Sequence, residues 1–133
     1  MPHLPQRKVL ILEGDSAVRN ALLTLLASLG CEADVAYSGK QAIDTIQSEK
    51  FDAVLLDLRC PHAHAEEVVP KIHSLRPTFI ANVLVITGDV ADVKTLDLIE
   101  RYFLLHIPGN RPIKEMAATP RVLLHIPPVL DYA

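Results

Sequence analysis

The chain has 133 residues, half of them hydrophobic and 22% charged, which excludes a disordered, collagenous or solenoid protein and suits one domain with a packed core. Sixteen acidic and thirteen basic side chains give a formal net charge of −3, so we expect direct binding neither to nucleic acid nor to anionic membranes. The sequence has only two cysteines, and its apolar runs are far shorter than the roughly 20 residues of a membrane span. Its N-terminal stretch has no apolar signal core, so we expect a cytoplasmic protein.

Short apolar runs alternate with helical patterns along the chain. Residues 9–12 are a β-branched, apolar run typical of a strand that is buried on both faces. Residues 17–29 repeat apolar side chains at helical spacing, with Asp15 or Ser16 as N-cap and Gly30 as the C-terminal stop. The same alternation predicts further strands and helices, with strands at 32–37, 53–58, 82–87 and 102–107 and helices at 39–48, 65–75 and 91–101. Five strands separated by helices predict a doubly wound α/β fold, in which a five-stranded parallel sheet carries helices on both faces.

The last segment of the chain is harder to assign. Residues 113–124 predict a closing helix, although Pro120 must either kink it or begin a second short helix. We expect one domain over residues 8–126, with tails at 1–7 and 127–133.

Polar residues follow three of the apolar runs, where a parallel sheet forms its ligand crevice. Glu13 and Asp15 follow the first run, Asp57 ends the third, and Thr87 ends the fourth. A carboxylate placed directly after four apolar residues of an interior strand pays a desolvation cost unless a charge compensates it. Asp57 can instead cap the next loop by accepting hydrogen bonds from backbone amides. Acidic residues at the end of the first strand favour compensation by a hard cation such as Mg²⁺.

Three segments resemble the receiver domain of bacterial response regulators, in order and spacing, across nearly the whole chain. Residues 8–19 (KVLILEGDSAVR) resemble the family's first strand, acidic pair and opening helix. Residues 51–61 (FDAVLLDLRCP) are similar to the phosphoacceptor strand and the proline four residues beyond the acceptor. Residues 83–88 (VLVITG) resemble the fourth strand with its hydroxyl residue. The resemblance implies a flavodoxin-like receiver fold.

The resemblance also implies a role for each of these polar residues. Asp57 would accept a phosphoryl group from a sensor histidine kinase or a phosphotransfer protein, and Thr87 would contact the phosphoryl oxygens. Mg²⁺ would be held at a site made by Glu13, Asp15, Asp57 and Arg59. Phosphorylation would then change the shape presented to a downstream protein partner, and a homodimer is compatible with this role. The resemblance implies no enzymatic activity beyond self-phosphorylation and self-dephosphorylation at Asp57.

The acidic pair departs from the family pattern. Glu13 matches the first acidic position, but Gly14 stands at the second, and Asp15 lies one residue further on. Asp15 could restore a metal ligand by turning inward, or it could serve as the helix N-cap. Cys60, three residues after Asp57, has no Cys-His constellation around it in the sequence, so we expect it to pack in the core.

The family's basic residue, a lysine before a proline at the end of the fifth strand, has two candidate replacements. Arg111 precedes Pro112 and keeps the cation next to a proline. His106 ends an apolar run as the lysine would, with Phe103 placed like the family's aromatic switch residue. We favour Arg111, because neutral histidine replaces a permanent cation poorly.

Two functions remain open from the sequence, and a third is weaker. The leading hypothesis is a phosphorelay receiver that accepts a phosphoryl group on Asp57. The alternative is a pseudo-receiver, a protein-interaction module that works without phosphorylation, which Gly14 favours. A small hydrolase or transferase that uses Asp57 with Mg²⁺ ranks below both, because the sequence offers no obvious substrate lid.

Overall fold

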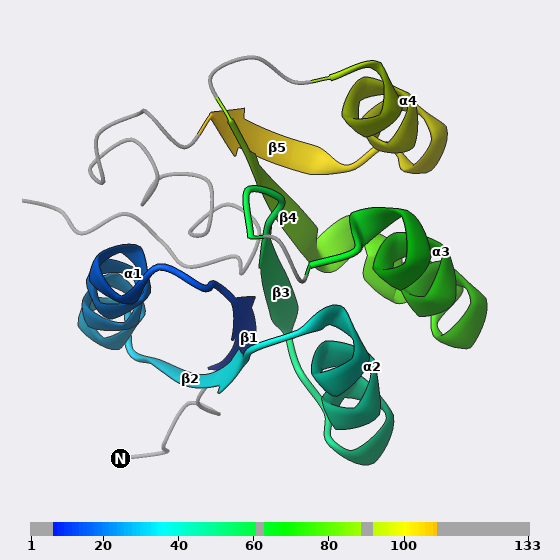
Figure 1. Cartoon of the computed structure of the whole chain (residues 1–133). Coiled ribbons are helices and arrows are strands. Elements are labelled where there is room, and N and C mark those ends of the chain that lie inside the picture. The colour runs from blue at the N-terminus through cyan, green and yellow to red at the C-terminus, as the bar shows by residue number, and fades with distance from the viewer. Residues whose placement is uncertain (1–6, 61–62, 89–91, 109–133) are drawn as a thin grey trace, which may run out of the picture.

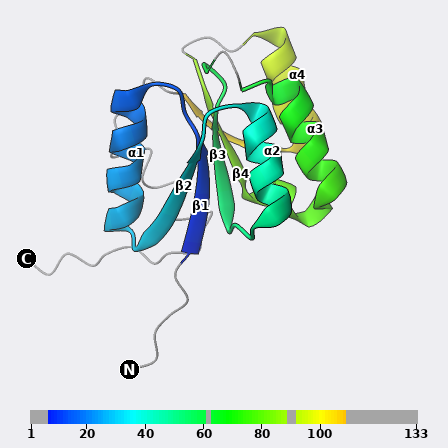
Figure 2. The same ribbon diagram turned by 60° about the horizontal axis from the view of Figure 1, so that its bottom comes forward.

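The structure is a computed structural model of the chain that describes residues 7–60, 63–88 and 92–108. One parallel sheet carries its strands in the order β2-β1-β3-β4-β5 (Figure 1). The strands are β1 (Arg7–Leu12), β2 (Cys31–Ala36), β3 (Ala53–Asp57), β4 (Val83–Thr87) and β5 (Leu105–Pro108). The helices are α1 (Ser16–Ser28), α2 (Gly39–Ser48), α3 (Ala65–Leu75), the 3-10 helix η1 (Pro77–Asn82) and α4 (Val93–Tyr102). Figure 2 shows α1 on one face of the sheet and α2 and α3 on the other, which confirms the predicted doubly wound α/β fold.

Two apolar clusters hold the helices against the sheet, one on each face. Successive side chains of a strand point to opposite faces, so neighbours in β1 enter different clusters. Val9 lies in one cluster with Leu26 of α1, and Leu10 lies in the other with Ile46 of α2 and Ile72 of α3. Burial on both faces explains why β1, β3 and β4 read as unbroken apolar runs in the sequence.

The largest difference from the predicted elements lies before β5. The strand was expected from residue 102, but α4 continues to Tyr102 and β5 begins only at Leu105. Phe103 ends the helix in the left-handed conformation, with φ 53° and its N–H directed at the carbonyls of Ile99 and Glu100. The predicted start at residue 102 is therefore wrong, because helix-capping hydrogen bonds use the backbone groups that the strand would need.

Smaller differences have equally local causes. Asp92 accepts a hydrogen bond from the Thr95 backbone as the N-cap of α4, so this helix begins at Val93 rather than near residue 91. Pro77 opens the unpredicted 3-10 helix η1, whose last residue is Asn82, and β4 therefore starts one residue later than expected. The predicted closing helix at 113–124 lies outside the described residues. In the described part of the chain, no helix has the length and apolar character needed to cross a bilayer.

Candidate functional site

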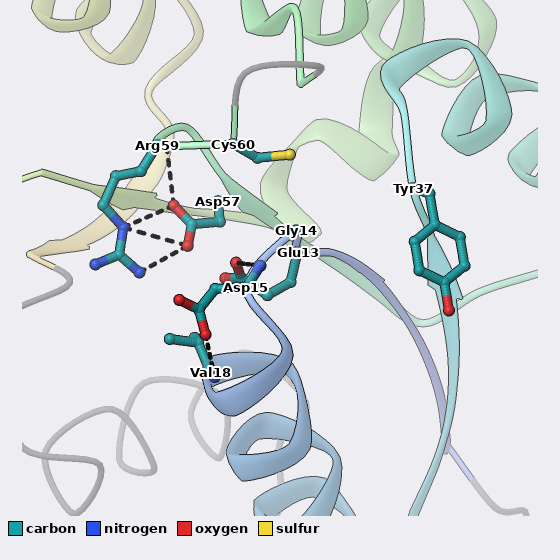
Figure 3. Close-up of a pocket in the computed structure, with 8 residues that line it drawn as sticks. All are labelled: Glu13, Gly14, Asp15, Val18, Tyr37, Asp57, Arg59 and Cys60. Atoms are coloured by element: carbon teal, nitrogen blue, oxygen red, sulfur yellow. Dashed lines mark hydrogen bonds and ion pairs between the residues drawn. The ribbon is translucent and has the colours of Figure 1, made fainter.

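A pocket of about 580 Å³ opens at the carboxyl edge of the sheet (Figure 3). Glu13 and Gly14 enter it from the loop after β1, and Asp57, Arg59 and Cys60 enter it from the end of β3 and the turn that follows. The strand order places β1 and β3 side by side, so the two loops meet above neighbouring strand ends. The predicted convergence of Glu13 and Asp57 is therefore present.

Asp57 is buried, with 2% of its surface exposed, and its carboxylate accepts several hydrogen bonds. Oδ1 accepts from the backbone N–H and the Nε–H of Arg59, both at 2.9 Å, and Oδ2 accepts from Nη2 at 2.7 Å. Burial by itself would raise the pKa of Asp57, but the hydrogen bonds and charge of Arg59, together with the neighbouring Glu13 carboxyl group, outweigh burial and bring this pKa below its ordinary value. The carboxylate both caps the turn and meets the charge of Arg59, while its expected contact with a hard cation stays a prediction.

Glu13 is equally buried but has fewer hydrogen-bond partners. Its Oε1 accepts from the backbone N–H of Asp15 at 2.9 Å. Among the residues that the structure describes, its Oε2 has no hydrogen-bond partner. Burial and the neighbouring Asp57 carboxyl group raise the pKa of Glu13 to about 7. An acidic oxygen without a partner, beside a second carboxylate, suits a proton or a hard cation.

Asp15 acts as the N-cap of α1. Its Oδ1 accepts from the backbone N–H groups of Ala17 at 2.9 Å and Val18 at 3.1 Å, and Figure 3 shows the carboxylate beside Val18. In the described ranges, no group of three or more His, Cys, Asp or Glu side chains is arranged to hold a metal ion. Of the acidic residues expected at the metal site, Glu13 and Asp57 are both buried beside the pocket, whereas Asp15 is held as the helix cap.

Cys60 lies against the position where the family carries its second acidic residue. A Cβ atom built on Gly14 would lie 3.1 Å from the Cys60 sulfur, which is closer than most real contacts of this kind. Cys60 is buried in the core cluster on the α2 and α3 face, as expected, and its thiol is free. The thiol therefore takes some of the space that a side chain at residue 14 would need.

Thr87 lies where it was expected, whereas His106 and Phe103 do not. Thr87 is buried at the end of β4, and its hydroxyl lies 3.5 Å from the carbonyl oxygen of Ile107, a long contact. His106 is exposed and pairs with Val85 within β5, so it does not lie at the end of the strand, where the family's lysine would stand. Phe103, expected as an aromatic switch residue in the strand, is instead the exposed cap of α4. Arg111 lies outside the described residues.

The ion pair between Arg59 and Asp57 is the part of the site that the sequence did not predict. The resemblance had placed Arg59 in the metal site without specifying what its side chain contacts. The available signal was the spacing of two residues between a buried carboxylate and a cation across a turn, where the longer side chain can fold back.

Comparisons with known proteins agree with this geometry. Residues 9–103 match the family described as response regulator receiver domain. The transcriptional regulatory protein CutR of Streptomyces coelicolor is 30% identical over 132 residues, which cover 95% of this chain and 59% of CutR. The response regulator MprA of Mycolicibacterium vanbaalenii is 30% identical over 118 residues, which cover 88% of this chain and 50% of MprA. The chain thus spans little more than half the length of these relatives.

Solved structures share the same architecture at lower sequence identity. A CheY-like receiver domain protein from Methanospirillum hungatei superposes with a TM-score of 0.80 at 20% identity, covering 91% of this chain and 95% of that one. The receiver domain of the sensor histidine kinase PA1611 from Pseudomonas aeruginosa gives a TM-score of 0.77 at 15% identity, covering 91% of this chain and 99% of that one. That structure is described with a magnesium ion coordinated in its active-site cleft. At such identities the likeness shows the fold.

Proposed function

Because this chain belongs to the family of response regulator receiver domains, we propose that it is a phosphorelay receiver whose phosphoacceptor is Asp57. One observation carries the proposal: a buried carboxylate at the carboxyl end of the central strand, with a second buried carboxyl group beside it. Family members are typically signalling modules, so no turnover of an external substrate is proposed beyond self-phosphorylation and self-dephosphorylation.

The proposed reaction is an in-line transfer from a phosphohistidine. An oxygen of Asp57 attacks the phosphorus atom, the phosphorus–nitrogen bond breaks, and its electron pair stays on the histidine nitrogen. The product is an acyl phosphate on Asp57. The low pKa of Asp57 favours this chemistry because the carboxylate is ionised, but Arg59 must release at least one oxygen before it can attack.

Other residues of the site would bind the transferred phosphoryl group or the metal ion that neutralises it. Glu13 and Asp57 would hold Mg²⁺, joined by Asp15 if this residue left its capping position, and Mg²⁺ would neutralise charge on the phosphoryl oxygens. The magnesium reported for the PA1611 receiver domain supports this assignment by analogy. The hydroxyl of Thr87 is loosely held by Ile107, so it is available to turn towards a phosphoryl group. Arg111 stays a candidate for contact with that group.

Phosphorylation is tested with acetyl phosphate and Mg²⁺. We expect intact-mass spectrometry to show one added phosphoryl group, and hydroxylamine to remove it, as it removes acyl phosphates. Asp57→Asn should stay unmodified under the same conditions. An unmodified wild-type protein, or modification that persists in Asp57→Asn, would refute the assignment of the acceptor.

The proposed partners follow from this chemistry. A sensor histidine kinase or phosphotransfer protein in the cytoplasm would donate the phosphoryl group, and a downstream protein, or a second copy of the chain, would respond to it. CutR and MprA are described as regulators, but this chain spans only about half of each, so their activities as whole proteins are not carried over.

A pseudo-receiver is the second candidate function. The close approach of Cys60 to Gly14 and the ion pair of Arg59 with Asp57 both favour it, because each occupies space or atoms that a phosphorylated site would use. Beryllofluoride, which mimics a phosphoryl group, separates the two functions. A receiver should show NMR shifts at Asp57 and Thr87 when beryllofluoride and Mg²⁺ are added together, whereas a pseudo-receiver should show none.

A further inference from the structure

The Arg59 guanidinium engages both oxygens of the Asp57 carboxylate. Nε lies 2.9 Å from Oδ1 and 3.2 Å from Oδ2, and Nη2 lies 2.7 Å from Oδ2. The backbone N–H of Arg59 adds a further hydrogen bond to Oδ1. A fork of donors that faces a carboxylate in this way combines charge with directional hydrogen bonds, and it is stronger than a contact through charge alone.

The two partners differ in their access to solvent. The Asp57 side chain is 2% exposed and the Arg59 side chain is 38% exposed, so the guanidinium can move into water while the carboxylate cannot. Leaving an ionised carboxylate buried without a counter-charge is costly, and the carboxyl group of Glu13 lines the same pocket. The protein at rest therefore needs a cation on Asp57.

The arginine side chain approaches Asp57 along the end of β4. A Cβ atom built on Gly88, the residue after β4, would lie 3.9 Å from Cγ of Arg59. On the next strand, His106 is exposed in the middle of β5 and not at the crevice edge. In the described part of the chain, the cation that faces Asp57 thus comes from the turn after β3 rather than from β5.

We propose that Arg59 is the resident counter-cation of the crevice, which neutralises Asp57 at rest and must leave that carboxylate before a divalent cation can bind it. A guanidinium and Mg²⁺ compete for the same two oxygens, because the two cations repel each other and because Mg²⁺ demands close contact with oxygen. Binding of Mg²⁺ must therefore break the ion pair. This inference rests on the proposed site at Asp57, but it does not require phosphoryl transfer.

Isothermal titration with MgCl₂ alone, without any phosphodonor, tests the competition. Arg59→Met keeps the length of the side chain and removes its charge and donors, so we expect Mg²⁺ to bind about tenfold more tightly than to wild type. Arg101→Met is the matched control, because Arg101 also forms an ion pair with an aspartate, Asp97, at 2.8 Å, but on the exposed surface of α4. The control has the same change in net charge and should leave the Mg²⁺ affinity within about twofold of wild type.

Thermal unfolding provides a readout that does not depend on the titration. Without Mg²⁺, Arg59→Met should have a lower melting temperature than wild type, and Mg²⁺ should raise the melting temperature more for the variant than for wild type. Arg59→Lys keeps the charge and loses the fork, so it serves if Arg59→Met does not fold, and its affinity for Mg²⁺ should exceed that of wild type.

The outcomes separate this inference from phosphorylation. Equal, weaker or absent Mg²⁺ binding in the foldable Arg59 variants would overturn it, as would a gain of the same size in Arg101→Met. If wild type accepts no phosphoryl group but Mg²⁺ binding tightens in Arg59→Met, the proposed function fails while the inference stands. If wild type is phosphorylated but replacing Arg59 does not change the affinity for Mg²⁺, the proposed function stands and this inference fails.

Discussion

β3 and β5 flank β4 in the same parallel sheet, yet they are built in opposite ways. β3 is central, all five of its residues are buried, and it ends in a carboxylate held by hydrogen bonds. β5 is an edge strand of four residues, the first two exposed, and Phe103 before it holds a strained conformation with 90% of its surface exposed. The carboxylate of the crevice is therefore fixed at the end of a buried interior strand, whereas the strained residue is an exposed helix cap that precedes an edge strand.

The largest expected effect on stability comes from Gly39, which packs closely against residues that follow β3 in the chain. A Cβ atom built on Gly39 would lie 2.5 Å from the carbonyl oxygen of Ala63 and 2.6 Å from a methyl group of Val68. Gly39→Ala should therefore destabilise the protein by about 2–3 kcal/mol, because backbone must move to make room. Urea unfolding measures this, with Lys40→Ala at the next, exposed position as the control. A loss below about 0.5 kcal/mol would show that the backbone at Ala63 is as adaptable as the β5 edge.

The next effect is a pH dependence of stability that originates in Glu13. Its pKa is raised from 4.5 to about 7 on folding, so the folded state holds a proton that the unfolded state has already lost in this interval. The stabilisation is fully present below about pH 4.5 and is lost as the pH rises through about 7, amounting to at most about 3 kcal/mol. Asp57 acts in the opposite direction, since its lowered pKa stabilises the fold above its ordinary value of 3.8 and this contribution is lost in stronger acid.

Urea unfolding of wild type and Glu13→Gln between about pH 5 and pH 8 isolates the contribution of Glu13. Glutamine imitates the protonated acid, so the decline seen for wild type should be absent in the variant. Curves that decline in parallel for the two proteins would assign the pH dependence to other groups.

The contrast between β3 and β5 also explains what the sequence could predict. Burial on both faces requires an unbroken run of apolar residues, so β3, expected at 53–58 and found at Ala53–Asp57, was predicted to within one residue. At β5 the apolar run begins in the helix, and only a hydrogen-bonded cap at Phe103 decides where the strand starts. The ion pair of Arg59 was missed for a similar reason, because sequence spacing does not show whether a side chain folds back over a turn.

A substitution that adds a ligand tests whether the crevice lacks only its second acidic residue. Gly14→Asp adds a third carboxylate near Glu13 and Asp57, but its Cβ atom would press against the Cys60 sulfur at 3.1 Å. We expect the double variant Gly14→Asp with Cys60→Ala to bind Mg²⁺ about tenfold more tightly than wild type, and Gly14→Asp alone to gain less. Calorimetric titration measures both, and Cys60→Ala alone should match wild type. Equal gains in Mg²⁺ affinity with and without the thiol would show that the Cys60 side chain moves aside at no cost.

The smallest expected effect belongs to the edge strand. Phe103 has φ 53°, a conformation that costs side-chain-bearing residues about 1–2 kcal/mol and costs glycine almost nothing. Phe103→Gly should therefore stabilise the protein by about 1 kcal/mol in urea unfolding, after the larger backbone entropy of glycine in the unfolded chain is subtracted. Phe103→Ala is the matched control, because it removes the same exposed ring but keeps the Cβ atom and its strain, and it should change stability by less than about 0.5 kcal/mol. If both variants lost stability, the ring would be packing against another part of the protein, and the edge of the sheet at β5 would be as constrained as its centre at β3.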